Sequence, residues 1–497
     1  MEIVTDTRLL FAVLAPLCGA GLVMAAGKWP NVREGCSLLA ALVLFGLTLT
    51  FIPDIQQGKI LTLTVFELLP GLSVALRADA LSLIFAVSAS FLWMLTVFYS
   101  AGYMRSLEEH KQTRFNTCFA LAIFGAMGCA FADNLFTLYL FYEIVSICTY
   151  PLVAHHQDEE SYAGARKYLV YLTATAKALV LPGMIIIYVL SGTLDFAYGI
   201  REGILPHNLP SGIVIGVYVC MLIGFAKNGI MPLHGWLPSA MVAPTPVSAL
   251  LHAVAVVKVG VFCTVRVMLS VFGTDCMQDY HLGLPTAYFV SFTILVASVI
   301  ALTKDNLKAR LAYSTVSQLS YIILGVALLT PSGIEGGLVH IANHAFAKIT
   351  LFFCAGAIYV ATHKKNISEM AGLGRKMPWT FGAFAIASLS MIGVPPVAGF
   401  VSKWYLLIGA WDAGSIGILV ILVVSTLLNA AYFVPVIITA FFGHPAQGDA
   451  HADDHGHGAP RAMVIPLCIT AALSVALGIY PDFFLQFTSI LTRVLIP

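Results

Sequence analysis

The chain has 497 residues, of which 59% are hydrophobic and only 10% are charged, and its formal net charge is +1. Soluble domains carry about 25% charged residues, so this composition excludes a soluble globular protein and indicates that lipid is the surrounding solvent. The near-zero net charge provides no general basic surface for nucleic acid, which we exclude as a partner.

Long apolar segments follow one another along the chain. A helix needs roughly 20 apolar residues to cross about 30 Å of hydrocarbon. The runs are continuous rather than alternating with a period of two, which argues against an outer-membrane barrel. We predict an all-α integral membrane protein with about 14 transmembrane helices, near residues 9–27, 36–52, 79–100, 115–132, 134–153, 167–190, 212–243, 246–270, 285–303, 311–330, 335–360, 379–410, 413–442 and 462–486.

Three further features complete this outline. The segment 57–78 is too short and too interrupted by Pro70 and Gly71 to span, and we expect a small hairpin or surface element there. The N-terminus lacks a basic stretch before Leu9, so we interpret the first apolar run as a retained span. The ten cysteines form no CxxC pair, and we expect them to act as small hydrophobic residues.

Two of the predicted spans are interrupted. The seventh contains Met231-Pro232 and Pro238, and the twelfth contains Gly393-Val394-Pro395-Pro396. Proline breaks a helix, and in a membrane broken backbone is tolerated only where it is buried in protein or lines a wet cavity. Because the breaks lie five helices apart, we predict two inverted five-helix repeats with broken helices 7 and 12. The expected organisation is 1–114 for helices 1–3 with a short extracytoplasmic element, 115–270 and 285–442 for the two repeats, and 443–497 for a cytoplasmic His-rich loop and helix 14.

Basic residues are distributed unequally between the two sides of the predicted helices. Of 26 lysines and arginines, fifteen lie in loops after odd-numbered helices, six lie on the side of the termini and five lie within spans. Loops rich in Lys and Arg stay in the cytoplasm. We therefore predict a multi-pass protein of the inner (cytoplasmic) membrane with both termini extracytoplasmic.

Ionisable side chains inside the predicted spans are the candidate functional residues. A charge at the bilayer centre costs at least ~2.5–3.5 kcal/mol and therefore marks an ion or proton path. Glu143 is the acid, and the bases are Lys177, Lys227, His252, Lys258, His340, His344, Lys348 and Lys403. The spacing of four places His340, His344 and Lys348 on one helix face over about 12 Å. Lys177 and His252 are secondary candidates.

The residue types favour protons over metal cations as the transported species. Nitrogen bases with one carboxylate exchange protons, whereas Na⁺, as a hard cation, prefers oxygen ligands. Burial weakens the hold of a lysine on its proton and a nearby carboxylate strengthens it, so a lysine with a moving acid partner is a switchable proton carrier. The hydroxyls and amide between Tyr313 and Tyr321 either hold water for relay or bond neighbouring helices.

Purely structural explanations of these buried ionisable residues compete with a proton path. Any single buried lysine can be a structural ion-pair partner or can extend its amine to the membrane surface. Lys177 either pairs with Glu143 or carries protons itself, and we favour pairing. His340 and His344 lie on one helix with no ligand pair opposite, so we predict neither a metal nor a haem there. The loop 444–457 offers His444, His451, His455 and His457, but its Gly and Asp residues indicate a solvated loop.

No P-loop, dinucleotide-binding or iron–sulfur signature occurs, so we predict no cofactor. Uphill proton movement would then draw its energy from another ion gradient or from a partner.

Four stretches of sequence carry a family resemblance. They are Lys227-Asn-Gly-Ile-Met-Pro-Leu-His-Gly-Trp-Leu-Pro238 with its continuation to Lys258-Val-Gly, Leu311 to Tyr321, His340 to Lys348, and Gly393 to Lys403. These motifs resemble the antiporter-like subunits of respiratory complex I, membrane-bound hydrogenases and Mrp-type cation/proton antiporters, over roughly residues 115–410. With Lys at 403 and an end soon after the fourteenth helix, the chain is most similar to subunits of hydrogenase or formate-linked complexes and to the Mrp D-type subunit.

The resemblance implies roles for the candidate residues. Glu143 and Lys227 would form the controlling ion pair, Lys258 with His344 or Lys348 the central path, and Lys403 the terminal proton site. Lys177 has no general role in that family, and the acid that some relatives carry in the sixth helix is absent here. The implied partners are antiporter-like and small membrane subunits of the same complex, lipid and a redox module.

We therefore expect a proton-translocating subunit without its own redox centre, within an NADH:quinone or a hydrogenase/formate-linked oxidoreductase complex. One alternative is a subunit of a Na⁺/H⁺ antiporter without redox drive. Another is a non-conducting scaffold whose charges hold helices together.

Overall fold

The computed structural model describes residues 2–69, 71–444 and 458–495. Its elements up to the first break are β1 (Glu2–Thr5), α1 (Arg8–Ala25), α2 (Pro30–Thr50), α3 (Ile52–Gln56), β2 (Lys59–Leu69), β3 (Leu72–Ala78), α4 (Ala80–Ser106), α5 (Gln112–Ala130), α6 (Leu135–Val153), α7 (Glu159–Thr175), the π-helix η1 (Ala176–Val180), α8 (Leu181–Ser191) and α9 (Ser211–Gly224).

The second part of the chain is also helical. Its elements are η2 (Ala226–Asn228), α10 (Trp236–Ser239), η3 (Ala240–Val242), α11 (Thr245–Ala253), α12 (Val256–Val267), η4 (Met268–Phe272), α13 (Gly273–Asp279), α14 (Gly283–Thr303), α15 (Leu307–Ala327), α16 (Pro331–Thr362), η5 (Ile367–Met370), α17 (Leu373–Lys376), α18 (Pro378–Ile392), α19 (Ala398–Asp412), α20 (Ile416–Phe442), α21 (Arg461–Ile479), α22 (Asp482–Thr492) and η6 (Arg493–Leu495).

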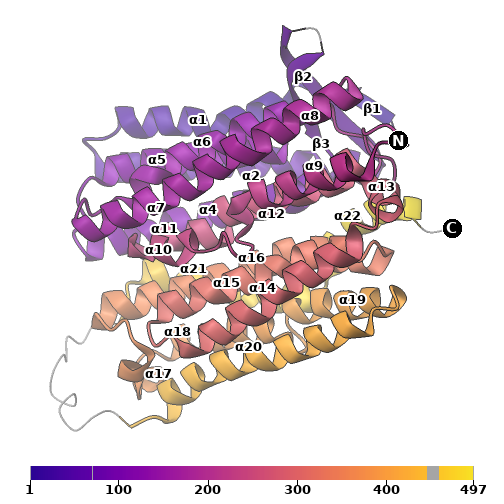
Figure 1. Ribbon diagram of the computed structural model, residues 1–497. Helices are drawn as coiled ribbons and strands as arrows, with labels where there is room; N and C mark the ends of the chain where they lie inside the picture. The colour runs from indigo at the N-terminus through magenta and orange to yellow at the C-terminus, as the bar shows by residue number, and fades with distance from the viewer. Residues whose placement is uncertain (1, 70, 445–457, 496–497) are drawn as a thin grey trace.

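The long helices run side by side in one bundle, with the N-terminal helices along one edge and α18 to α20 along the other (Figure 1). Helices occupy all fourteen stretches expected from the sequence. In the described part of the chain, ten helical stretches are long and apolar enough to cross a membrane, and α9 and α18 are shorter apolar helices. The protein is thus an integral multi-pass membrane protein of all-α class, and the total of fourteen spans stays a prediction.

The segment 57–78 forms the expected hairpin. Strands β2 and β3 pair antiparallel, with Leu61 opposite Ala78, and β1 pairs parallel to β2, with Glu2 opposite Lys59. This small sheet lies at the end of the bundle that also carries α22, so both ends of the chain emerge on the same side (Figure 1).

Both predicted breaks are confirmed, and the structure adds a third. In the seventh segment, regular helix stops at Gly224 and resumes at Thr245 apart from short turns. In the twelfth, residues 393–397 separate α18 from α19. The eighth segment is interrupted at Val254 and Ala255, where the sequence contains neither proline nor glycine.

Helix α16 is the structural centre of the second half. It packs against α4, α11, α15, α18, α19 and α21, and residues 336–358 along it are buried without interruption. All ten cysteines are free thiols, as expected from the absence of CxxC pairs. Most of the His-rich loop, residues 445–457 with His451, His455 and His457, lies outside the described residues.

Candidate proton path

The break in the seventh segment leaves backbone groups that a buried amide satisfies. Asn228 Nδ2 donates to the Leu222 carbonyl at 2.9 Å and to Thr264 Oγ1 at 3.2 Å, and Asn228 Oδ1 accepts from the Ile230 N–H at 3.1 Å. Non-helical backbone at membrane depth requires partners of this kind. The break is therefore a supported feature, and it holds Lys227 in the protein interior.

Lys227 is fully buried and binds neutral acceptors on α6. Its Nζ donates to the Tyr142 carbonyl at 2.8 Å and to Ser146 Oγ at 2.7 Å, and lies 3.1 Å from the centroid of the Tyr142 ring. These two acceptors come from positions four apart, which share one face of a helix.

Glu143 does not form the ion pair with Lys227 that the family resemblance implies. In the described part of the chain its carboxylate makes no ion pair, and its Oε1 has no hydrogen-bond partner. Glu143 is half-buried and interacts electrostatically with Lys227 across a gap. The reason is angular, because Glu143 follows Tyr142 and lies about 100° further round α6 than the face that meets Lys227. We call this separated state of Glu143 and Lys227 the open arrangement.

Lys177 differs from the other lysines of the predicted spans. It is exposed on the surface of the single chain, within the π-helix η1. The pairing with Glu143 that we favoured is not formed, although the two side chains are close enough to interact electrostatically. Lys177 is therefore set apart from the buried lysines by its exposure.

Three ionisable side chains at the centre of the molecule have no hydrogen-bond partner among the described residues. Lys258 Nζ and both ring nitrogens of His252 and of His344 are buried and make no hydrogen bond with the described residues. Lys258 acts electrostatically on His344, and His344 also senses His252. An unsatisfied buried polar group costs about 1–3 kcal/mol, so this part of the interior is costly as it stands. The third helix break separates His252 on α11 from Lys258 on α12.

The face of α16 that carries His340, His344 and Lys348, here called the α16 stripe, is directed toward α15 and α19. His340 Nδ1 lies 2.8 Å from Ser402 Oγ, and its Nε2 lies 3.1 Å from Gln318 Oε1. The rings of His340 and His344 are 5.8 Å apart between centroids. One turn beyond His344, Lys348 Nζ donates to Ser314 Oγ at 2.9 Å. All three residues of the stripe therefore point into the same interior.

The hydroxyls of α15 divide between the two roles considered for them. Ser314 contacts Lys348 and Gln318 contacts His340, so both lie beside candidate residues of α16. Ser317 instead bonds Ser298 of α14 at 2.9 Å and holds two helices together.

Lys403 lies just after the second break. It is 6% exposed, and its Nζ donates to the Ile392 carbonyl at 2.8 Å, the last carbonyl of α18. The ring of Tyr321 lies 5.2 Å from this amine, and Tyr321 donates in turn to Ser425 Oγ at 2.7 Å. His340 interacts electrostatically with Lys403, so the α16 stripe and Lys403 are neighbours.

A polar pocket of about 700 Å³ opens at the end of the bundle opposite the termini. Glu109, His156, Thr245, Lys308 and Tyr359 are among its lining residues. Thr245 begins α11, and His252 lies two turns further along this helix, on the same face. His252 interacts electrostatically with Lys308, which lines the pocket, and with Lys348 in the interior. The charge at the pocket therefore influences the buried bases through His252. Sequence reasoning missed this pocket, since its residues come from five separate loops and helix ends.

A buried ion cluster at the end that carries the termini was also missed. Arg266 binds Asp79 through both terminal nitrogens, at 2.6 and 2.9 Å, and Arg77 Nε lies 3.2 Å from Asp79. Asp133 lies 3.5 Å from Arg77. Burial raises the pKa of Asp133 to about 7, and Arg77 opposes this only in part because it is shared with Asp79. The signal in the sequence was the pair Arg77 and Asp79 beside a predicted span.

Comparisons with known proteins show the family and the fold of the chain. Residues 132–429 match the family model described as NADH:quinone oxidoreductase/Mrp antiporter, transmembrane. The N subunit of the NADH-quinone oxidoreductase of Desulforudis audaxviator is 34% identical over 424 residues, covering 83% of both chains. A polypeptide of a probable K⁺/H⁺ antiporter of Rhizobium meliloti is 32% identical over 483 residues, covering 94% of this chain and 46% of the relative.

A solved structure supports the fold. A chain of the Mrp complex from Dietzia superposes with a TM-score of 0.85 at 22% identity, covering 98% of this chain and 96% of the other. At this identity the likeness concerns the fold alone.

Proposed function

Because this chain belongs to the NADH:quinone oxidoreductase/Mrp antiporter transmembrane family, we propose that it carries protons across the membrane as an antiporter-like subunit of a larger complex. The observation that supports this most strongly is the state of its interior lysines. Lys227, Lys258, Lys348 and Lys403 are buried, and in the described part of the chain none of them is paired with a carboxylate. Lysines that served only to hold helices together would be paired, because an unpaired buried charge is costly.

The proposed route begins at the polar pocket beside Thr245 and Lys308. Protons pass to His252 and to the central group of Lys258, His344 and Lys348. Water would link Lys258 to the imidazoles of His252 and His344, which have no hydrogen-bond partner among the described residues. His340, held between Ser402 and Gln318, connects this group to Lys403. Lys403 releases protons toward the side of the termini.

Glu143 and Lys227 form the proposed control element. In the open arrangement, neutral acceptors hold the Lys227 amine, and the Glu143 carboxylate lies apart. Closure to a separation of about 4 Å would stabilise the charged pair by about 4 kcal/mol at an effective dielectric of ~20. That energy is equivalent to roughly a thousandfold change in proton affinity, which is enough to load or unload a lysine.

The proposal extends to the membrane in which the chain lies, its orientation, its internal repeats and its partners. We propose that the chain lies in the inner (cytoplasmic) membrane with the pocket on the cytoplasmic side and both termini outside, because the loops at the pocket end carry most of the basic residues. We also propose two inverted repeats over 115–270 and 285–442, supported by breaks in corresponding helices. The partners are other membrane subunits and a redox module that supplies the energy.

Lys403→Met tests the proposal in the reconstituted complex. Methionine keeps an unbranched apolar stem but cannot carry a proton. We expect proton transfer to fall more than about tenfold, since proton transfer by a positioned side chain contributes at least that much. We expect the complex to assemble normally and the redox module to keep transferring electrons. Lys376→Met, at an exposed position on α17, is the matched control. Normal proton transfer by Lys403→Met would contradict the proposed path.

A second function is supported by the similarity to the K⁺/H⁺ antiporter polypeptide. In that case the same path would exchange protons for a monovalent cation without redox drive. Proton movement in vesicles that depends on an imposed Na⁺ or K⁺ gradient, with no electron donor present, would favour exchange. Movement that requires the donor would favour redox drive.

A further inference from the structure

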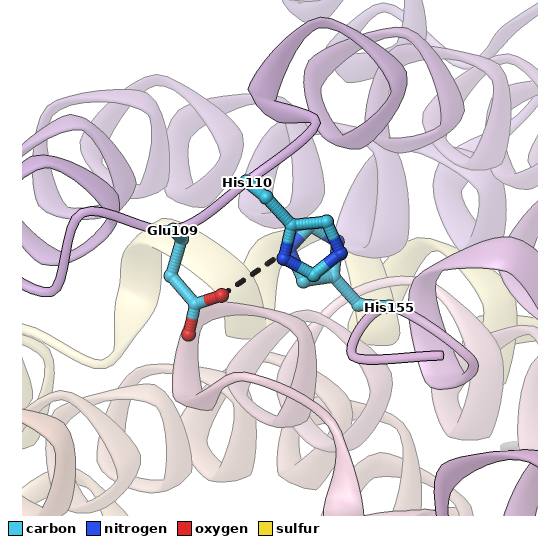
Figure 2. A group of neighbouring side chains, drawn as sticks. All are labelled: Glu109, His110 and His155. Atoms are coloured by element: carbon cyan, nitrogen blue, oxygen red, sulfur yellow. Dashed lines mark ion pairs between the residues drawn. The ribbon is translucent and has the colours of Figure 1, made fainter. Parts of the chain in front are cut away.

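Three metal-ligand side chains meet outside the proposed path. Glu109 and His110 come from the loop between α4 and α5, and His155 comes from the turn after α6 (Figure 2). One ligand atom from each of the three lies within 4.8 Å of the other two. Glu109 Oε2 is 3.5 Å from His155 Nε2, and the two imidazole rings are 4.9 Å apart between centroids.

The buried imidazole of His155 is the second observation that indicates a ligand. His155 is completely buried, and neither of its ring nitrogens has a hydrogen-bond partner in the part of the chain that the structure describes. An ion pair of Glu109 with a protonated His155 accounts for one nitrogen but leaves the other without a partner. Packing against Phe115, at 5.8 Å between ring centroids, accounts for the position of the ring but not for its polar atoms. A buried nitrogen base facing a carboxylate and a second imidazole is the environment of a metal ligand.

The donor set selects the metal class. Two imidazole nitrogens and one carboxylate oxygen suit Zn²⁺, which takes tetrahedral sites of this composition. Ligands at 2.0–2.1 Å from a tetrahedral Zn²⁺ lie about 3.3 Å from one another, close to the 3.5 Å between Glu109 and His155. His156 Nδ1 lies 3.6 Å from Glu109 Oε2 and is partly exposed, so the fourth position is open to this ring or to water.

We propose that Glu109, His110 and His155 bind a divalent transition-metal ion of the Zn²⁺ class. The ion would tie the loop after α4 to the turn after α6. Glu109 and His156 line the polar pocket, so the ion would sit at the rim of the proposed proton entrance. There its positive charge would oppose the entry of protons into the pocket and slow proton uptake.

Zn²⁺ binding to the purified, chelator-treated complex tests the site. His444, His451, His455 and His457 are first replaced by Ser, so that the His-rich loop cannot contribute. In this background we expect one Zn²⁺ per chain, and His155→Phe should weaken binding more than about tenfold while keeping an aromatic ring against Phe115. His155→Cys should restore binding, because a thiolate is also a zinc ligand. His207→Ala, at an exposed position on the opposite end, should bind normally.

The outcomes separate the metal site from the proposed function on which its effect rests. Equal Zn²⁺ affinity of the His155→Phe variant and its parent would overturn the metal site. If binding behaves as expected, Zn²⁺ should slow proton transfer by the parent and leave His155→Phe unaffected. Binding without slowing would overturn the effect on uptake and leave the site standing. Failure of the proposed function itself would appear as normal transfer in Lys403→Met, whatever Zn²⁺ does.

Discussion

Gly393 leaves the space that the side chain of Lys403 occupies: a Cβ built on Gly393 would lie 2.6 Å from Lys403 Cδ. Gly393 also has a φ of +90°, in the left-handed region that residues with a side chain rarely adopt. The glycine therefore serves two purposes, since it ends α18 and lets the lysine pass the break.

Gly393→Ala should impair proton transfer while changing no ionisable group. The methyl group displaces Lys403 from the Ile392 carbonyl, and the left-handed backbone adds about 1 kcal/mol or more of strain. We expect both slower transfer in proteoliposomes and a lower thermal midpoint in detergent. Gly382→Ala, where nothing lies within 4 Å of the new Cβ, is the control and should be neutral or slightly stabilising. Equal behaviour of the two variants would refute the steric role of Gly393.

Glu143→Gln should slow proton transfer with little loss of stability. The carboxylate makes no ion pair among the described residues, so the amide breaks no contact, but it cannot close on Lys227. Transfer rates and assembly of the complex should be measured together. A variant that fails to assemble would indicate that Glu143 is a structural residue, and a variant with a normal rate would eliminate the control element.

Asp133→Asn should remove a pH dependence of stability. The groups that face Asp133 are Arg77, Asp79, Asp195, Tyr198 and Arg266. With burial raising its pKa to about 7, the folded protein binds the proton more tightly than the unfolded chain. The stabilising contribution of the protonated form is therefore complete below the ordinary value and is lost as pH rises toward 7. The thermal midpoint of the parent should fall over this window relative to that of Asp133→Asn, and parallel curves would contradict the assignment.

Much of this molecule could be predicted from the sequence because its strongest signals are local. Apolar run length located the helices, and prolines and glycines located two breaks. The cost of burying a charge identified Lys227, Lys258, Lys348 and Lys403 as interior residues before their contacts were known. The hairpin at 57–78 followed from its short length and from Gly71.

The features that could not be predicted depend on the direction of side chains around a helix axis and on contacts between segments far apart in the chain. A shift of one residue along α6 separates Tyr142, which faces Lys227, from Glu143, which does not. The break at Val254 and Ala255 has no proline or glycine to announce it. The site of Glu109, His110 and His155 joins two loops 45 positions apart, and neither loop contains a recognisable metal motif. Exposure of Lys177 follows from which way η1 faces, and the mostly apolar residues on either side of Lys177 have no periodicity that defines this direction.

The most direct test of the proton path is Lys258→Met. Lys258 is fully buried, and its amine makes no hydrogen bond with any described residue, so the substitution removes a proton carrier without breaking a contact. The measurement is proton transfer per turnover by the reconstituted complex, with Lys376→Met as control. The account predicts normal assembly and loss of proton transfer, whereas normal transfer through a complex carrying Lys258→Met would contradict it.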